Sequence, residues 1–531
     1  MRPSTGRESW AKLRRRWNDL GWKTRRRLRA IGILLSLALV LAGGWGVVSL
    51  VLPDLTCDED EGIVRETEGG ECVGVTDGSY VFAEYLRESL DLVKTENERV
   101  EREWADEEVP YVTVAFILPF TSPDAIEQQQ MVSELQGAHL AQYRANREAE
   151  RPGIRLVVGN TGEHSEQWSV VTDRLAELAD SPQERLRAVT GLNVSTDETS
   201  AAVRELTRDH GIPVVVGPLT ADGLENDPEG SYPGLARVIA DNSDQAAALA
   251  SFFGDIDPSR TLLVEDLREE DDYISSLREV YQERTRDAAH APETFRSPPN
   301  INDEGNLANE FQAMVNSICN MTDVDTVYFA GRNVQLRLFV NALVGRGCQD
   351  KDYQVITISG ASTLITDEKL DWEGLESGSV TVRYTSNAHP DAWRSEEAPA
   401  TGGSEADFNE LLAARDRVGL TGLDLSDSRA ITMHDAVTTA VEGIRNSVTS
   451  ESAVPPLDAV ANAWSRMHGD PGNFIHGASG WICLDAYGRS YNKAVSIVRL
   501  DPAERGIRFE GLAWPTGAAP EANCPIPNDR E

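Results

Sequence analysis

The first long apolar run of the sequence spans Ala30–Leu52 and contains no charged residue. A helix over these 23 residues reaches roughly 35 Å, which is enough to cross the hydrocarbon core of a membrane. Residues 1–30 carry eleven Lys and Arg residues against two acids, and such a basic flank keeps an N-terminus in the cytoplasm. The pattern predicts a basic cytoplasmic tail over residues 1–29, a single transmembrane helix over residues 30–52, and a body outside the cell membrane.

A cleaved signal peptide is the alternative interpretation of the same run. The apolar core of a signal peptide usually has about 7–15 residues and ends at a small-x-small cleavage site. The run here is longer, and Ser49–Pro53 offers no such site. Both features favour a retained anchor.

From Tyr111 onward, apolar strands alternate with amphipathic helices, and the alternation restarts after Asp241–Gln245. Such alternation indicates βαβ units and a parallel sheet, so two series predict two doubly wound α/β lobes. The strands of the first series are Val112–Leu118, Ile154–Val158, Arg187–Thr190 and Pro213–Val216. Those of the second series are Thr261–Val264, Thr326–Phe329 and Val355–Ile358.

The same pattern gives the predicted domain boundaries. Phe82, Leu86, Leu90 and Val93 recur at helical spacing after a Gly-rich, acidic stretch, which predicts a Cys-containing juxtamembrane cap or stalk. A polar insertion near 387–424, a helix near 433–448, and a last strand pair near 481–484 and 494–500 complete the pattern. The predicted divisions are a cap at 53–110, a first lobe at 111–240 and 386–455, a second lobe at 241–385 and 456–515, and a tail at 516–531.

The charge balance and the cysteines narrow the class of protein. Beyond residue 30 the chain has 39 Lys and Arg against 85 Asp and Glu, which argues against a nucleic-acid partner. All six cysteines lie beyond the predicted anchor, where an oxidising compartment favours three disulfides. Of the several pairings that are open, proximity in sequence favours Cys57–Cys72, Cys319–Cys348 and Cys483–Cys524. No Cys-x-x-Cys motif or Cys/His cluster is present, so no metal site is predicted.

Catalysis has little support in the sequence. A phosphate-binding Gly-x-x-x-x-Gly-Lys-Ser/Thr loop, a Gly-x-Ser-x-Gly elbow and a His-Glu-x-x-His motif are all absent. The string His476–Gly480 is displaced by one residue from the elbow pattern, and His434 lies within a predicted helix, where a packing role is more common. We therefore predict no catalytic residue, no cofactor and no enzymatic activity.

Several strings in the body occur in a familiar order. They are Val112–Pro119, Gln136–Asn146, Val189–Thr196, Gly211–Pro218, Asp241–Gln245, His434–Val437 and Gly480–Gly488. Through them, residues 111–515 resemble the type 1 periplasmic binding proteins of the leucine/isoleucine/valine-binding branch. The resemblance implies two lobes joined by three hinge strands, with a small-molecule ligand held between them. The Cys-containing cap and single anchor look like those of a membrane-tethered bacterial subgroup.

The resemblance also implies ligand contacts in the first lobe. Ser195 stands where amino-acid-binding members use a Ser for the ligand carboxylate, and Thr196 adjoins it in a loop that precedes a helix. Leu219 and Ala221 stand where those members use a backbone carbonyl and a Thr hydroxyl, and Thr220 is the expected substitute for that hydroxyl. A simple helix-capping role for Ser195 or Thr196 is the alternative.

In the second lobe the match to the family is only partial. Tyr273 matches a stacking Tyr, Arg332 stands where members often have Tyr, and Ser359 stands where they place the acid that receives the ligand ammonium. Loss of that acid and gain of an Arg favour an anionic small molecule over an α-amino acid. The alternatives are that Tyr273 packs within its own lobe and that Arg332 pairs with an acid of the protein.

These features together predict a membrane-tethered extracytoplasmic solute-binding protein that captures a small polar metabolite, amino-acid-like or anionic, between its two lobes. It is expected to serve ABC-type import, with a permease as partner. A ligand-sensing ectodomain is one alternative. A cytoplasmic tail of about 30 residues is too short for a signalling domain, so a sensor would signal through another protein. A structural surface protein without a ligand is the other alternative.

The charge asymmetry around Ala30–Leu52 gives a topological prediction. Protease added to spheroplasts is expected to digest the body and leave a short anchored N-terminal fragment, detected by an N-terminal tag. Recovery of a soluble mature protein that begins near residue 53 would instead show that the anchor is cleaved.

Overall fold

The computed structural model describes most of the chain that follows the predicted anchor. The described residues are 57–58, 62–65, 70–148, 151–254, 256–377, 379–449, 453–469 and 473–527. The predicted cytoplasmic tail and transmembrane helix lie outside them, and no helix within these ranges is long and apolar enough to cross a membrane. Residues 60–531 form one unit, which is the subject of the description below.

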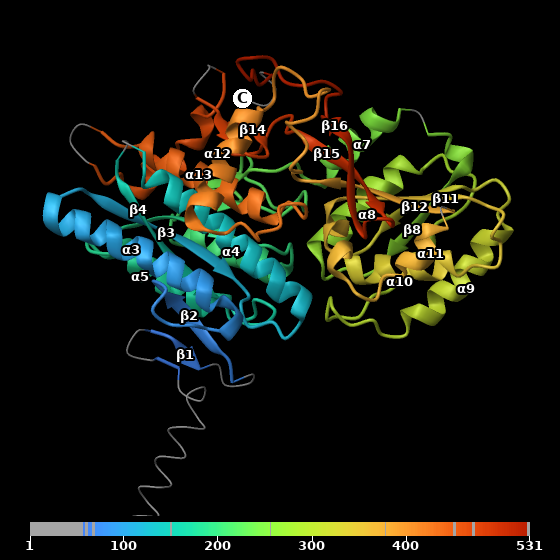
Figure 1. Cartoon of the computed structure of the whole chain (residues 1–531), viewed down its shortest axis with the longest axis horizontal. Coiled ribbons are helices and arrows are strands. Elements are labelled where there is room, and N and C mark those ends of the chain that lie inside the picture. The colour runs from blue at the N-terminus through green and yellow to red at the C-terminus, as the bar shows by residue number, and fades with distance from the viewer. Residues whose placement is uncertain are drawn as a thin grey trace, which may run out of the picture. The chain divides into compact units, whose positions relative to one another are not determined.

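The first lobe is built on a mainly parallel sheet with the strand order β1-β2-β4-β3-β5-β6-β7. Figure 1 labels its strands β1 to β4. Strands β4, β3, β5, β6 and β7 run parallel, and β2 and β1 continue the sheet antiparallel at one edge. The bounds are β1 Val64–Arg65, β2 Cys72–Thr76, β3 Tyr111–Leu118, β4 Gly153–Asn160, β5 Leu186–Gly191, β6 Val214–Val216 and β7 Leu235–Arg237.

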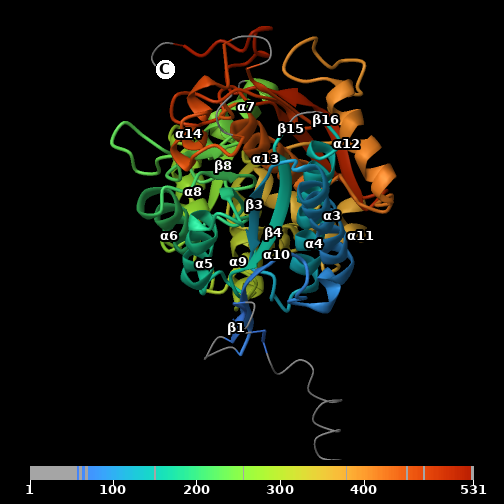
Figure 2. The ribbon, with the colours of Figure 1, turned by 90° about the vertical axis from the view of Figure 1, so that its left-hand side faces the viewer.

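Helices cover both faces of the first sheet. Along β3, Val114 and Phe116 enter one hydrophobic core, whereas Ala115 and Ile117 enter another on the opposite face. Helices α3 and α4 lie on the first face and α5 and α6 on the second (Figure 2). The bounds are η3 Glu84–Leu86, α3 Arg87–Glu107, α4 Ala125–Ala145, α5 Trp168–Asp180, α6 Asp197–Arg204 and the π-helical η4 Glu205–Asp209. Burial on both faces is typical of a doubly wound sheet.

The second lobe repeats this plan with the strand order β16-β15-β12-β11-β10-β8-β9. Its strands are β8 Thr261–Asp266, β9 Glu293–Phe295, β10 Thr326–Ala330, β11 Tyr353–Thr357, β12 Val380–Ser386, β15 Val495–Asp501 and β16 Gly506–Ala513. One face is covered by α9 Leu307–Asn320, α10 Asn333–Val344 and α11 Trp372–Glu376, and the other by α7 Asn242–Phe253 and α8 Asp272–Arg284. Short 3₁₀ turns η5 Pro258–Arg260 and η6 Ser359–Thr366 complete this lobe. The two α/β lobes predicted from the sequence are present.

One predicted boundary differs from the structure. The chain returns to the first lobe after β12 and stays there through α12 Glu405–Val418, α13 Arg429–Arg445, α14 Leu457–Ala461, η7 Trp464–Arg466, β13 Ile475–Gly477 and β14 Gly480–Ile482. Val460, Trp464, Ile475 and Ile482 are buried in the same core as α4. Residues 456–484, which we expected in the second lobe, therefore pack with the first.

The last predicted strand pair is also corrected. β14 pairs with β13, whereas β15 pairs with β12 and β16. The two predicted strands belong to different sheets because the segment between them crosses from one lobe to the other. The polar insertion near 387–424 contains the helix α12.

The chain crosses between the two lobes three times, after β7, after β12 and between β14 and β15. The crossings contact one another directly. Ser490 Oγ donates a hydrogen bond to the carbonyl of Ile239 (2.5 Å), and the Arg237 N–H donates to the carbonyl of Gly488 (2.9 Å). Gln245, which is fully buried, links the first crossing to the second: its amide donates to the Ala240 carbonyl (3.0 Å), and its carbonyl oxygen accepts from the Thr385 hydroxyl at the end of β12.

The segment expected to form a separate cap is part of the first lobe. β2 extends the sheet beside β4, and α3 packs against β4 and α4. Leu86, Leu90 and Val93, predicted to line a helix, are buried in the core of the first lobe. The cap therefore has no core of its own among these described residues.

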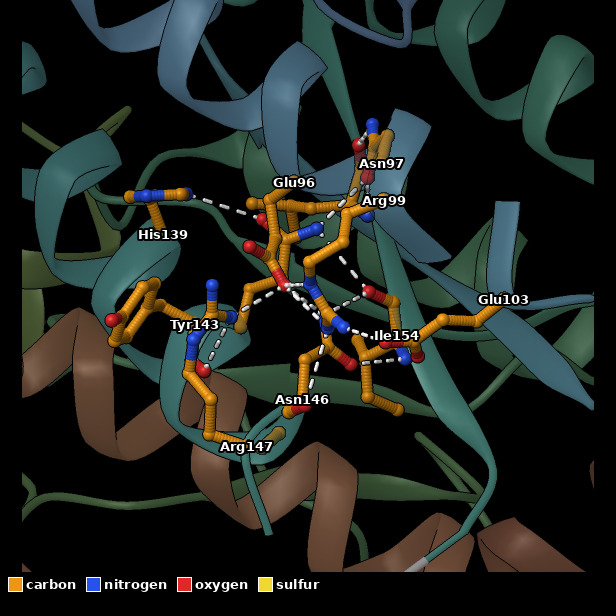
Figure 3. A network of polar contacts seen from close by, with 12 residues as sticks. Glu96, Asn97, Arg99, Glu103, His139, Tyr143, Asn146, Arg147 and Ile154 are labelled. Carbon is orange, nitrogen blue, oxygen red and sulfur yellow. Dashed lines mark hydrogen bonds and ion pairs between the residues drawn. The ribbon is translucent and has the colours of Figure 1, made fainter. Parts of the chain in front are cut away.

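Two asparagine side chains complete the outer edge of β4 (Figure 3). β2 pairs only with residues 158–160 of that strand. Asn146 accepts from the Ile154 N–H (2.7 Å) and donates to its carbonyl (2.9 Å). Asn97 accepts from the Leu156 N–H (2.9 Å) and donates to its carbonyl (2.7 Å). Each amide therefore replaces a missing strand partner, which buried backbone groups require.

A buried carboxylate holds this edge and α3 together. Glu96 accepts hydrogen bonds from Arg99 (2.8 Å), Arg147 (2.8 Å) and Asn146 (2.9 Å), as Figure 3 shows. Burial opposes the charge, but the two arginines outweigh it and lower the pKa of Glu96. The network fixes α3 to the loop between α4 and β4.

The disulfides agree with the predicted pattern. Cys319 is bonded to Cys348 and Cys483 to Cys524, as predicted. Cys57 and Cys72 are disulfide-bonded as well.

The edge of β4 gives a stability prediction. Asn97→Ala leaves the N–H and C=O of Leu156 without partners, so it is expected to lower the free energy of unfolding by about 2–4 kcal/mol. Asn309→Ala, at an exposed position of α9, is the control and is expected to change it by less than about 0.5 kcal/mol. Urea unfolding followed by circular dichroism measures both. Equal midpoints for the two variants would contradict the assigned role of Asn97.

Candidate ligand-binding site

A cavity of about 190 Å³ lies between the two lobes. Its lining comes from loops and helix starts that follow β3, β5 and β6 in the first lobe and β8, β9, β10 and β11 in the second, together with Asn387 after β12 and residues at the start of α13. These loops meet at the carboxyl ends of the parallel strands, where open α/β sheets bind ligands. A second cavity adjoins it, and the two linings share Glu127, Gln130, Asn193, Val194, Ile301 and Arg429.

The structure brings most of the predicted site residues together. Ser195, Thr220, Tyr273, Arg332 and Ser359 all line the first cavity. Two of the predicted residues have other positions. Thr196 lines the adjoining cavity, and the fully buried side chain of Leu219 packs in the core beneath the first sheet.

The alternative interpretation of Thr196 agrees with the structure. Thr196 is the N-cap of α6, and its hydroxyl accepts from the Thr199 N–H (3.4 Å). Ser195 lies one residue earlier, buried, with its hydroxyl oxygen accepting from the Ala221 N–H (3.5 Å). Ser195 therefore holds the loops after β5 and β6 together and still has a hydroxyl proton to donate.

Arg332 is paired within the protein. Its Nε and Nη2 donate to the two oxygens of Asp271 (2.6 and 2.8 Å), and Nη2 also donates to the Ser195 carbonyl across the cleft (2.9 Å). Burial disfavours the cation, but Asp271 outweighs it and raises the pKa of Arg332. The positive charge on which we based the expectation of an anionic ligand is therefore compensated by a carboxylate that is itself fully buried.

Tyr273 faces the cavity but belongs mainly to the core of the second lobe. The residue is 5% exposed and packs among Ile274, Leu277 and Tyr328. Its hydroxyl oxygen lies 2.4 Å from the point where a β-carbon on residue 360 would be, so this contact requires Gly360. Burial raises the pKa of Tyr273, so the phenol stays neutral.

The cavity contains charged pairs that the sequence analysis did not identify. Arg429 pairs with the fully buried Glu134 (2.5 Å), which also accepts from Asn193 (2.8 Å). Burial raises the pKa of Glu134, and the charge of Arg429 opposes this rise. Arg337 and Lys369 share Glu304, each at 2.7 Å.

Two of the missed acids had signals in the sequence. Glu134 lies on the same helical stripe as Met131 and Ala138, where a charged residue implies a buried partner. Asp271 directly precedes α8 and accepts from the Ile274 N–H (3.1 Å), as N-cap residues do. Neither signal identifies the basic partner.

His434, Asp435 and Ser479 lie together in the first lobe, but their arrangement is not that of a nucleophilic triad. Asp435 contacts His434 Nδ1 (2.9 Å) and accepts from the Ser479 N–H (2.8 Å) and O–H (2.5 Å). In a triad the imidazole lies between the hydroxyl and the carboxylate. Here the carboxylate lies between the other two groups, so the imidazole is not positioned to take the proton of Ser479. These hydrogen bonds to Asp435 instead fix the turn between β13 and β14 against α13.

No protein-family model and no curated protein matches the sequence. Solved structures share its fold. A leucine-binding protein LivK from Thermotoga maritima is 17% identical, with a TM-score of 0.54, over 77% of this chain and 100% of that chain. LivJ from Streptococcus pneumoniae, a branched-chain amino acid transporter substrate-binding protein solved with isoleucine, is 15% identical, with a TM-score of 0.53, over 76% of this chain and 99% of that chain. An ABC transporter solute-binding protein from Rhodopseudomonas palustris, solved with p-hydroxybenzoic acid, is 14% identical, with a TM-score of 0.53, over 76% of this chain and 96% of that chain. At these identities the likeness establishes the fold.

The buried pair beneath the cavity gives a testable prediction. Asp271→Asn leaves the Arg332 guanidinium buried without its anion, so it is expected to lower the free energy of unfolding by about 3–5 kcal/mol. The double variant Asp271→Asn with Arg332→Gln removes both charges and is expected to recover much of that loss. Urea unfolding of the four proteins of this mutant cycle measures the coupling.

The control is an exposed ion pair of the same kind. Arg260 and Asp325 have 54% and 36% of their side chains exposed, so Asp325→Asn is expected to lower the free energy of unfolding by no more than about 1 kcal/mol. Additive effects of the two substitutions at Asp271 and Arg332 would show that the pair is not coupled.

Proposed function

We propose that this chain, which has the fold of the type 1 periplasmic binding proteins, is an extracytoplasmic solute-binding protein. In this proposal it closes its two lobes around a small polar molecule and serves ABC-type import. The predicted helix over residues 30–52 tethers it to the cell membrane, and a permease is its partner.

The observation that carries this proposal is a set of buried polar atoms without partners around one cavity. Thr363 Oγ1, Asn193 Oδ1 and Arg429 Nε make no hydrogen bond in the part of the chain that the structure describes, and all three residues line the cavity between the lobes. A buried polar group without a partner is unfavourable by about 1–3 kcal/mol. A polar ligand that bonds to these atoms removes that penalty, so the cavity is suited to binding one.

Hydrogen bonds between the two lobes stabilise the closed form. Asn302 of the second lobe donates to Glu127 of the first (2.9 Å), and Ser200 of the first donates to Asp272 of the second (2.6 Å). A ligand that touches both lobes binds better to the form that makes these contacts, and so increases its population. The solute-binding proteins with the same fold support import as the process that this closure serves.

A ligand screen followed by one substitution tests the proposal. Compounds that raise the melting temperature of the purified protein are carried into calorimetry with wild type and Ser195→Ala. Ser195→Ala removes a buried hydroxyl and leaves a ligand group without its hydrogen-bond partner, so it is expected to weaken binding by about 1–3 kcal/mol. Small-angle scattering is expected to give a smaller radius of gyration with the ligand than without it.

Ser169→Ala is the matched control, since Ser169 is exposed on α5 and does not line the cavity. It is expected to bind like wild type. The proposal is wrong if a broad metabolite screen finds no stabilising compound. It also fails if Ser195→Ala binds like wild type and the radius of gyration does not change.

A further inference from the structure

The basic side chains that line the cavity all have acidic partners. Arg332 pairs with Asp271, Arg429 with Glu134, and Arg337 and Lys369 with Glu304. Arg337 also pairs with Asp367 at 2.5 Å. The partners of Arg332 and Arg429 are fully buried, so an anionic ligand that drew either of these two cations away would leave a buried carboxylate uncompensated, which is strongly unfavourable.

Glu127 differs from these acids because its carboxylate is held only by neutral groups. One oxygen accepts from the Asn302 amide (2.9 Å) and the other from the Ser122 hydroxyl (2.5 Å). No basic group among the described residues forms an ion pair with it within 4.0 Å. Glu127 lines both the inner cavity and the adjoining one, so this carboxylate lies where the two cavities adjoin.

The adjoining cavity is acidic on both sides of the cleft. Glu163, Glu166, Asp197 and Glu198 of the first lobe line it together with Glu270 of the second, and they outnumber the basic residues Arg268 and Arg429. The pKa of Asp197 is raised by burial and by nearby acids, among them three of the second lobe. Acids of the two lobes therefore face one another where the lobes meet, and they repel unless a cation lies between them.

The neutral groups of the inner cavity are suited to the same kind of ligand. Thr363 is 5% exposed and its hydroxyl oxygen has no partner among the described residues, and Asn193 Oδ1 is a second acceptor without one. The N–H groups of amines and guanidines are hydrogen-bond donors, and these oxygens can accept hydrogen bonds from them.

We propose that the ligand of this cleft is a small organic cation, an amine or guanidine with net positive charge, whose charge is recognised by the Glu127 carboxylate. This inference rests on the proposed function and names its ligand class. The unpaired carboxylate attracts the charge, the acids of the outer cavity steer it inward, and the neutral oxygens accept its remaining N–H groups. A cationic ligand is the opposite of the anionic one expected from Arg332 and from the missing acid at Ser359.

Calorimetry on the purified full-length protein tests this inference with two sets of probes. The first set is putrescine, agmatine and spermidine. The second is leucine, p-hydroxybenzoate and myo-inositol, which are zwitterionic, anionic and neutral. At least one probe of the first set is expected to bind, more weakly at 150 mM than at 20 mM sodium chloride, whereas the second set is expected not to bind.

Two substitutions with matched controls locate the binding. Glu127→Gln keeps the shape and removes the charge, and is expected to weaken amine binding at least about tenfold. Glu177→Gln, on the exposed surface of α5, is expected to bind like wild type. Thr363→Val is expected to weaken binding, whereas Thr439→Val removes a buried hydroxyl that also lacks a partner but lies outside the cavity lining, and should not. Unchanged melting temperatures check that the variants fold.

The outcomes separate this inference from the proposed function. Binding of a probe from the second set without any amine overturns the cationic ligand and leaves solute binding intact. Amine binding that is unchanged in Glu127→Gln overturns the assigned role of that carboxylate. Absence of binding by all three amines also overturns the inference, and the proposed function then depends on the wider metabolite screen.

Discussion

The chemistry of the cleft depends on the ion pair between Asp271 and Arg332. One carboxylate caps α8, compensates a buried guanidinium and orients it so that its second N–H reaches the Ser195 carbonyl in the other lobe. The guanidinium also lies 5.0 Å from the centre of the Tyr273 ring. A buried charge that loses its partner is unfavourable by several kcal/mol, so neither member is free to turn toward a ligand. The pair therefore makes Arg332 a structural link between the lobes.

The same constraint applies throughout the cavity and decides its electrostatics. Each basic side chain in the lining is paired with an acid of the protein. These cations therefore help to position a ligand, but their positive charge is already compensated and does not attract one. The groups that remain are a carboxylate bonded only to neutral donors and several buried neutral oxygens. Partners that lie behind the lining, such as Glu134 and Asp271, thus matter as much as the residues that face the cavity.

The sequence predicted the two lobes because apolar segments that alternate with amphipathic helices leave few other arrangements. It also predicted the cavity loops, since residues that follow parallel strands meet at one edge of a sheet. It did not place residues 456–484, whose short strands are buried against helices hundreds of residues earlier in the chain. The sequence also did not show that β2 belongs to the first sheet and not to a separate cap, because its partner strand β4 lies about 80 residues later in the chain. The role of Arg332 depends on a residue 61 positions earlier, and no local pattern reveals such a pair.

Gln245 connects the cavity to the crossings between the lobes. Its amide donates to Ala240 in the first crossing, and its carbonyl oxygen accepts from the Thr385 hydroxyl at the end of β12 and from the Ser359 N–H at the start of η6. The side chain is fully buried, so these bonds have no competing water. The turn η6 carries Ser359, Gly360 and Thr363 into the cavity. A ligand that bonds to this turn therefore acts on a segment fixed to two of the three crossings. Any change of conformation at the Gln245 amide would leave several buried groups without hydrogen bonds. When the lobes move, the residues that change conformation are therefore others, and not Gln245 and its hydrogen-bond partners.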